Sequence, residues 1–386
     1  MKTKTVMVTY GTRPEAIKLA PVIRLLREDS RFLTLVVSTG QHREMASQVT
    51  TLFGFKPDID LGLMHKRQTL NRILSRSLKG LDYILKDNKP DLVLVQGDTS
   101  TAASAAIAGF NRRAKILHLE AGLRSNDLSS PFPEEANRKI ISAIATHHLA
   151  PTQLAKENLL REGVPNHSIT VTGNTVIDSL QTIASRGSEI SNPEIQIALR
   201  TYNRHIVFTT HRRENISTLA EISTAIATLA KRYTDVGFYV PMHLNPKVQK
   251  RLLPTLTSLP NVVTTGPLPY DQFVELMKRS DLIITDSGGI QEEAPALRIP
   301  ALLIRDNTER PEAIQSGAVK LVGSNPRQID KVASELLDSP PKLTAMKNAT
   351  NPYGDGCAST RTIQVIEELL GLTATSSLAE FDPRLA

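Results

Sequence analysis

The chain of 386 residues has one cysteine, Cys357, no tryptophan and few aromatic residues. A single cysteine excludes an internal disulfide framework and a cysteine-based zinc site. Because only 4% of the residues are aromatic, stacking platforms for bases or sugars are disfavoured. The cysteine content fits a reducing compartment.

Long apolar runs are also missing. No window approaches the roughly 18 uninterrupted apolar residues that a membrane-spanning helix needs. The apolar run near the start, residues 5–9, is too short for a secretory signal, and Arg13 and Glu15 follow closely. We therefore expect a cytoplasmic protein with no membrane partner.

The formal net charge is +7, but the chain contains no long basic block. Lysine and arginine are interspersed with aspartate and glutamate, which disfavours nucleic acid as a partner. An anionic small-molecule substrate accounts for the same excess of positive charge.

Short apolar runs alternate with helical patterns, which favours parallel sheets covered by helices on both faces. A first series of expected strands comprises 5–9, 33–38, 91–96, 115–119, 147–151 and 169–173. A second series comprises 205–210, 237–243, 261–266, 282–287, 300–305 and 318–323. The residues between the series, 186–204, are polar and irregular.

This pattern predicts an α/β protein with two doubly wound, Rossmann-like domains. We expect an N-terminal domain over 1–175 and a C-terminal domain over 176–357. A helical pattern follows at 358–372, and the polar tail 373–386 is expected to be loose.

Unusual polar residues recur where the expected strands end. They lie in the stretches GTRPE, TGQH, QGDT and HLEAG of the first series and THRREN, HLNP and DSGG of the second. Ligands of open parallel sheets bind beyond the carboxyl ends of the strands. Two sheets whose strand ends face one another would form one interdomain cleft.

The stretch DSGGIQEE, residues 286–293, follows an expected strand and opens a helix. Gly288 and Gly289 would let a ligand approach the free N–H groups there, which suits a phosphate or diphosphate. Glu293 lies about one turn further on, where a carboxylate can bind two ribose hydroxyls. A plain strand-to-helix turn would have the same glycines, and the pattern is not GxGxxG, so a nicotinamide cofactor is disfavoured.

Cations recur at the same ends. Arg13 and Lys18 lie near a helix start, where the helix dipole disfavours positive charge, so a bound anion or facing carboxylates explain them better than solvated charge. Three further residues that can carry positive charge follow the expected strand 205–210, namely His211, Arg212 and Arg213. Arg310, in the stretch TERPEA, is similar.

The loop from His118 to Ile140 has many ionisable groups between an expected strand and an expected helix. His118 and Glu120, two apart on a strand, would share a face, and Asp98 could join them as metal ligands. No HExxH or DxD motif accompanies them, so no metal is expected. GxSxG and Walker A motifs, which would support serine-hydrolase or P-loop chemistry, are absent.

Eleven stretches, in this order, carry a family resemblance: GTRPEAIKLAP, TGQHREM, QGDT, HLEAGLRS, PFPEEANR, TGNTVID, HRREN, HLNP, DSGGIQEEAP, TERPEA and NPYGDG. They resemble the non-hydrolysing bacterial UDP-N-acetylglucosamine 2-epimerases over residues 4–372. The resemblance implies a GT-B type fold, whose last helix crosses back to the N-terminal domain, and usually a homodimer. It also implies reversible interconversion of UDP-GlcNAc and UDP-ManNAc through a 2-acetamidoglucal, without metal or cofactor, to supply sugars for cell-surface polysaccharide.

The resemblance also implies roles for particular residues. The acid/base candidates and their supporting cations are Asp98, Glu120, Glu134, Lys18, Arg138 and His211. UDP would be bound by His211, Arg13, Ser287, Gly288, Gly289, Glu293 and Arg310. A second UDP-GlcNAc, acting as an allosteric activator, would contact Gln41, Arg67, Gln68, Glu135, Arg212 or Arg213, and His243. Asp127 and Lys139 are interpreted as solvated charge.

Three alternatives stay open at this stage. The chain could epimerise a modified UDP-2-acetamido sugar, or it could be a GT-B glycosyltransferase that uses the same nucleotide seat. It could also be a nucleotide-sugar sensor without turnover. Conversion of UDP-GlcNAc alone, with no acceptor, distinguishes an epimerase from the last two.

Overall fold

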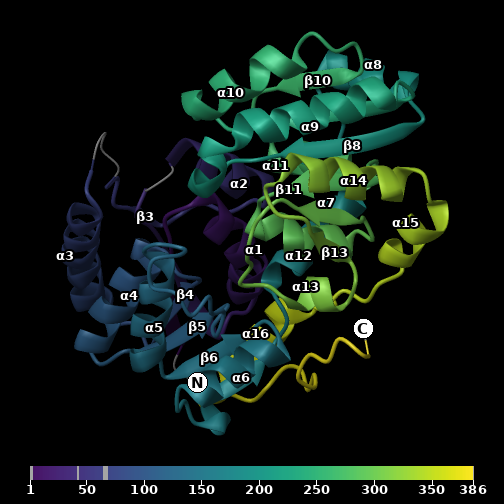
Figure 1. The fold of residues 1–386 in the computed structure, drawn as a ribbon. Helices are drawn as coiled ribbons and strands as arrows, with labels where there is room; N and C mark the ends of the chain where they lie inside the picture. The colour runs from purple at the N-terminus through teal and green to yellow at the C-terminus, as the bar shows by residue number, and fades with distance from the viewer. Residues whose placement is uncertain (1–2, 41–42, 64–67, 386) are drawn as a thin grey trace. The chain divides into compact units, whose positions relative to one another are not determined.

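A computed structural model describes residues 3–40, 43–63 and 68–385, apart from the side chains of 43–46 and 213–214. Two compact units make up the chain (Figure 1). Unit 1 contains Met1–Ser179 and Tyr353–Ala386, and unit 2 contains Leu180–Pro352.

Unit 1 is built on a parallel sheet with the strand order β3-β2-β1-β4-β5-β6-β7. Its strands are β1 (Lys4–Tyr10), β2 (Phe32–Ser38), β3 (Ile59–Asp60), β4 (Leu92–Gln96), β5 (Lys115–Leu119), β6 (His147–Ala150) and β7 (Ile169–Val171). Its helices are α1 (Arg13–Glu28), α2 (Arg43–Leu52), α3 (Leu70–Asn88), α4 (Ser100–Asn111), α5 (Glu134–Ile144), α6 (Gln153–Arg161), the 3₁₀ turn η1 (Asn166–Ser168) and α16 (Ala358–Leu369).

The core of unit 1 depends on small residues in α4. Its alanines pack with Met7, Val93 and Ile116 of the central strands. A Cβ atom on Gly109 would lie 2.6 Å from Cδ1 of Ile116, so this position needs glycine for the helix to lie so close to the sheet.

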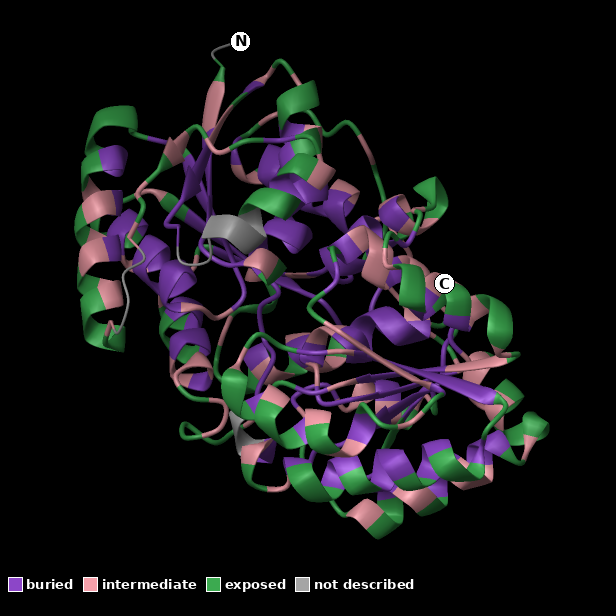
Figure 2. Ribbon diagram, turned by 90° about the horizontal axis from the view of Figure 1, so that it is seen from above, coloured by how far each residue is buried: buried purple, intermediate pink, exposed green. Residues whose placement is uncertain are grey.

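Unit 2 has a second parallel sheet, with the order β10-β9-β8-β11-β12-β13. Its strands are β8 (Arg204–Thr209), β9 (Val236–Pro241), β10 (Val262–Thr265), β11 (Leu282–Thr285), β12 (Ala301–Leu303) and β13 (Val319–Leu321). Its helical segments are α8 (Pro193–Thr201), η2 (Arg213–Ser217), α9 (Leu219–Arg232), α10 (Pro246–Leu256), α11 (Tyr270–Lys278), α12 (Gly288–Ala296), α13 (Glu312–Gln315), α14 (Pro326–Leu337) and α15 (Pro340–Lys347). Figure 2 shows buried strands between helices that are exposed on their outer faces.

The predicted α/β class with two parallel sheets is confirmed. The unit boundary lies at Ser179, inside α7 (Thr175–Arg186), rather than at residue 175, and the chain returns to unit 1 at Tyr353 rather than at 358. A backbone bond explains the second shift: the N–H of Asn174 donates to the carbonyl of Tyr353 at 2.7 Å, and Tyr353 is buried.

The C-terminal tail is ordered within unit 1, so the expectation of a loose tail is wrong. Phe381 is 4% exposed and packs with Val171 and Leu159. Its N–H donates to the carbonyl of Val171, and Arg361 lies over its ring. Polar bonds add to this aromatic anchor: Thr375 donates to Glu367, and Arg361 donates to the carbonyl of Ala379.

Across the described part of the chain, no helix combines the length and apolarity needed to cross a membrane.

Candidate active site

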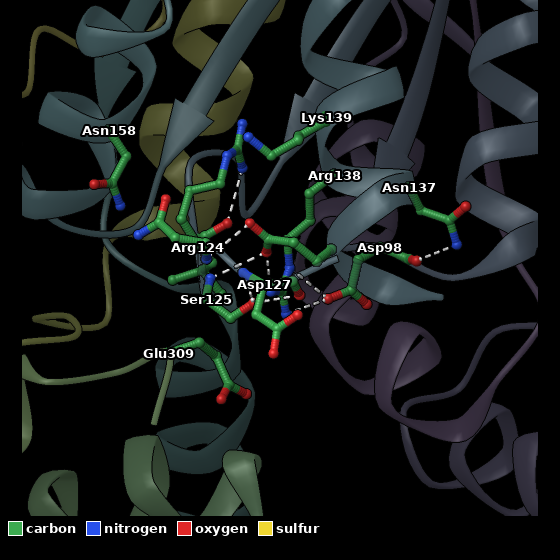
Figure 3. A network of polar contacts seen from close by, with 12 residues as sticks. Asp98, Arg124, Ser125, Asp127, Asn137, Arg138, Lys139, Asn158 and Glu309 are labelled. Carbon is green, nitrogen blue, oxygen red and sulfur yellow. Dashed lines mark hydrogen bonds and ion pairs between the residues drawn. The ribbon is translucent and has the colours of Figure 1, made fainter. Parts of the chain in front are cut away.

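Asp98 lies just beyond the end of β4 and is bound by Arg138 of α5 (Figure 3). The guanidinium of Arg138 donates to Oδ2 of Asp98 from Nε at 2.9 Å, and its Nη2 lies 2.7 Å from the same oxygen. The amide of Asn137 donates to the Asp98 carbonyl at 2.8 Å. The sequence-predicted acid and cation therefore meet, and the start of α5 fixes both the backbone and the side chain of Asp98.

Glu120 lies beyond the neighbouring strand, β5, and forms a buried ion pair with Lys18 of α1. Gln96 also donates to its carboxylate, and Asn174 donates at 3.2 Å. Glu120 has a φ of 64°, a left-handed conformation that ends the strand at Leu119. The prediction that His118 and Glu120 share one strand face is therefore wrong, because the alternation of side chains stops before Glu120.

Glu15 supports the start of α1. Its carboxylate accepts from the N–H groups of Gly11 and Thr12 and from the hydroxyls of Thr12 and Thr99, at 2.6–3.0 Å. Burial raises the pKa of Glu15, and the four donated bonds oppose that shift. This carboxylate ties the β1–α1 turn, which holds Arg13 and leads to Lys18, to the turn after β4.

The loop from Ala121 to Pro133 is held by a charged residue of α5. Glu135, a predicted activator contact, is fully buried and accepts from the N–H groups of Ser125 and Asn126 and from Arg138. Its oxygens thus hold the loop and orient Arg138. Glu134, the first residue of α5, is half-buried beside it.

Asp127 and Lys139, interpreted from sequence as solvated charge, are exposed. Asp127 accepts from the backbone and hydroxyl of Ser129, and Lys139 pairs with Glu162. Arg124 is buried and donates to Glu162, Ser142 and the Leu123 carbonyl, so it fixes the loop instead of facing solvent.

In unit 2, Asp286 organises the turn after β8. This fully buried carboxylate accepts from the N–H of His211 at 3.0 Å and from the N–H of Arg212 at 3.1 Å. The hydroxyl of Thr210 and the amide of Asn215 donate to it at 2.7 and 2.9 Å. Asp286 therefore sets the positions of two predicted ligand-binding residues.

The N-terminus of α12 lies under two guanidinium groups. A Cβ atom on Gly288 would lie 3.0 Å from Nη1 of Arg310 and 3.3 Å from Nη2 of Arg212. The first N–H groups of a helix carry partial positive charge, so three cationic features converge on one place. This arrangement suits a phosphate or diphosphate.

Two buried carboxylates hold these arginines. Glu292 accepts from Nε of Arg310 at 2.6 Å, and Glu309 accepts from Arg310 and, at 3.0 Å, from Arg305. Although burial opposes the shift, the charges of Arg310, Arg305 and Arg212 lower the pKa of Glu309. Both arginines of the α12 site, Arg212 and Arg310, contact Glu309, which is therefore placed to orient them.

Glu293 is buried on the same helix and accepts from the hydroxyl of Tyr270 at 2.7 Å. Ser287 precedes the helix, and Gly289 lies near both Ser287 and Glu293. His211 stacks on His243 with ring centroids 5.9 Å apart, so a predicted catalytic residue and a predicted activator contact are neighbours.

The other predicted activator contacts are placed in part. Gln68 donates to the Leu63 carbonyl at 2.8 Å. Gln41 and Arg67 lie outside the described residues, and Arg213 begins η2 with a side chain that is not described.

Sequence reasoning missed the residues that hold these side chains in place: Glu15, Gln96, Asn174, Tyr270, Asp286, Glu292 and Glu309. Six of them lie inside the quoted motifs, which is a signal that could have marked them: Glu15, Gln96, Asn174, Asp286, Glu292 and Glu309. Tyr270 carries no comparable sequence signal. Among the residues that the structure describes, no group of three or more His, Cys, Asp or Glu side chains could hold a metal ion.

Comparison with known proteins gives one consistent family. The family described as UDP-N-acetylglucosamine 2-epimerase matches residues 24–367. A Yersinia pestis UDP-N-acetylglucosamine 2-epimerase is 45% identical over 368 residues, which cover 94% of this chain and 98% of that protein.

Solved structures agree with this result. The structure of Neisseria meningitidis UDP-GlcNAc 2-epimerase bound to UDP-GlcNAc has a TM-score of 0.88 and 42% sequence identity to this chain. The similarity covers 94% of this chain and 100% of the Neisseria chain. The S. aureus MnaA–UDP structure has a TM-score of 0.91 and 38% identity, over 98% of this chain and 100% of that chain.

Proposed function

Because this chain belongs to the UDP-N-acetylglucosamine 2-epimerase family, we propose that it interconverts UDP-GlcNAc and UDP-ManNAc. The observation that carries the proposal is the convergence of Arg212 and Arg310 on the N-terminus of α12. In the proposed reaction the diphosphate is the leaving group, and these groups would stabilise its charge.

Unit 2 would bind the nucleotide. Its diphosphate would take the free N–H groups of Gly288 and Gly289 and the two guanidinium groups, while Glu293 would accept from ribose hydroxyls. Glu309 and Glu292 support this role, because both bind Arg310 and Glu309 also contacts Arg212. Such preorganisation lowers the cost of ordering side chains when an anion binds.

Unit 1 would supply the proton transfers. One carboxylate among Asp98, Glu120 and Glu134 removes the C2 proton, the electron pair forms the C1–C2 double bond, and the C1–O bond breaks as UDP leaves with its electrons. The reverse step on the other face returns a proton to C2 while a UDP oxygen attacks C1. Asp98 and Glu120 each pair with a different cation, Arg138 and Lys18, and this supports a separate place for each acid in the reaction.

The elimination can be tested by incubating the enzyme with UDP-GlcNAc alone in deuterated water. We expect UDP-ManNAc to form and deuterium to enter C2, both observed by NMR. Conversion without deuterium at C2 would overturn the elimination, and no conversion without an added acceptor would favour a glycosyltransferase.

The division of labour between the units can be tested with isosteric variants. Asp98→Asn and Glu120→Gln should lower kcat at least about 100-fold, within the range for lost general acid–base catalysis, while the Kd for UDP changes less than threefold. Arg310→Gln should do the opposite and mainly raise the Kd for UDP. Equal loss of UDP binding in both sets would contradict the division.

We also propose a cytoplasmic homodimer that a second UDP-GlcNAc activates. The stacking of His243 on His211 supports a link between the activator and the site. With UDP-ManNAc as the sole substrate, turnover should begin only after a trace of UDP-GlcNAc is added. Immediate turnover would contradict activation, and light scattering at the mass of one 42.4 kDa chain would contradict the dimer.

A further inference from the structure

Two histidines occupy paired positions on neighbouring strands of the unit 1 sheet. His118 of β5 and His148 of β6 are opposite each other in the register of the two strands, with ring centroids 6.4 Å apart. His118 is fully buried, and His148 is 2% exposed. Nδ1 of each ring is buried, and among the described residues neither Nδ1 has a hydrogen-bond partner.

His118 contacts the backbone next to Asp98. Nε2 of His118 lies 2.8 Å from the carbonyl oxygen of Gly97, the residue between β4 and Asp98. Since a carbonyl only accepts, Nε2 must carry the proton, which fixes the tautomer of the ring. Burial lowers the pKa of His118 to about 4, so the imidazole is neutral near pH 7.

The Gly97 peptide is also held from its other side. Its N–H donates to the carbonyl of Leu119 at 2.9 Å, and its φ is 70°, a conformation that favours glycine. A Cβ atom on this residue would lie 3.5 Å from Oε2 of Glu120. Both polar groups of Gly97 are thus fixed by β5, the strand that leads into Glu120.

We propose that His118 is a positioning residue, which sets the place of Asp98 relative to Glu120 by anchoring the Gly97 peptide. The inference rests on the proposed function, in which both acids act on one sugar. The Nε2 bond of His118 goes to the backbone carbonyl of Gly97 and not to the carboxylate of Asp98 or Glu120. His118 would therefore act on Asp98 through the backbone. A shift of about 1 Å at an acid can cost about 100-fold in rate, so a single anchoring bond has a measurable effect.

The test compares the same substitutions at the two paired histidines. His118→Leu removes the donor to Gly97, and His148→Leu leaves a similar gap without touching that peptide. We expect His118→Leu to lower kcat about 10- to 100-fold, with less than threefold change in KM and in the Kd for UDP. His148→Leu should lose similar thermal stability and keep kcat within twofold of the unchanged protein.

Two further variants keep the test independent of folding losses. His118→Gln places an amide N–H within reach of Gly97 and should restore most of kcat, whereas His118→Asn is too short and should not. Equal kcat in the Gln and Asn variants, unchanged kcat in His118→Leu, or the same loss in His148→Leu would overturn the proposal.

A structural readout separates this proposal from the proposed function. In a crystal structure of His118→Leu, the Gly97–Asp98 peptide should be displaced and the bond from Arg138 to Asp98 lost or lengthened, while His148→Leu retains both. An undisplaced Asp98 in His118→Leu would overturn the positioning role even if the enzyme proves to have another activity. Absence of C2 exchange in the unchanged protein would instead overturn the proposed function alone.

Discussion

Asp286→Asn tests whether Asp286 positions His211 and Arg212 for nucleotide binding in unit 2. The N–H of His211 is 3.0 Å from Oδ1 of Asp286, and the N–H of Arg212 is 3.1 Å from Oδ2. An asparagine retains one acceptor oxygen. If Oδ2 becomes the amide nitrogen, the N–H of Arg212 faces another donor. If Oδ1 does, the N–H of His211 keeps only its 3.2 Å contact with the remaining oxygen.

The cost follows from this geometry. A donor that loses its acceptor costs up to about 1–3 kcal/mol, and the bonds that remain lose the strengthening of a charged acceptor. We expect a loss of about 2–4 kcal/mol, divided between unfolding free energy and the displacement of His211 and Arg212. The Kd for UDP should rise at least about tenfold, which corresponds to about 1.4 kcal/mol.

The assays are denaturant unfolding and UDP titration calorimetry. Asp281→Asn is the matched control. Asp281 directly precedes β11, the strand that Asp286 directly follows, and it also accepts from a backbone N–H, that of His205, at 3.0 Å. It should reduce stability slightly and leave UDP binding unchanged. If Asp286 acted only as a negative charge near the nucleotide, its neutralisation would tighten UDP binding. Tighter binding in Asp286→Asn would therefore refute the positioning role.

Three further outcomes are expected. Tyr270→Phe removes the 2.7 Å bond to Glu293 and should raise the Kd for UDP about 3- to 10-fold by calorimetry, with a smaller effect on 2′-deoxy-UDP; equal effects on both would contradict the ribose role of Glu293. Phe381→Ala should cost unit 1 about 3 kcal/mol in denaturant unfolding, because a buried ring is lost, whereas an unchanged midpoint would show that the tail contributes nothing. Burial lowers the pKa of His118 to about 4 and that of His148 to about 3, whereas an unfolded histidine titrates near pH 6.5. The unfolded chain therefore binds more protons, and the unfolding free energy should be level above about pH 7 and fall from about pH 6.5 towards pH 4, less steeply in His148→Leu.

The sequence predicts two parallel sheets and every strand except β3, because buried parallel strands form short apolar runs that alternate with helical patterns. The sequence pattern also places Asp98, Glu120 and the N-terminus of α12 after strand ends, where ligands of such sheets bind. These inferences need only local patterns, and each depends on residues close together in the chain.

The pairing of side chains could not be predicted in the same way. Lys18 meets Glu120, and Thr99 meets Glu15, because strand register and the packing of α1 bring distant segments together. The left-handed conformation of Glu120 is equally invisible to a strand pattern, which would continue the alternation through this residue. Phe381 shows the same limit for the tail, whose composition is polar although one ring is buried.

The division of the chain has a consequence for the order of folding. Unit 2 is one continuous segment, whereas unit 1 is made from both ends of the chain. Asp178 accepts from the N–H groups of Ala358 and Ser359, and α1 packs against α16. On the ribosome the strands of unit 1 therefore emerge first, but α16 and Phe381 can join them only after unit 2 has been synthesised. A fragment that ends at Ser179 would lack α16 and Phe381, so an isolated unit 1 should require residues 1–179 joined to 353–386.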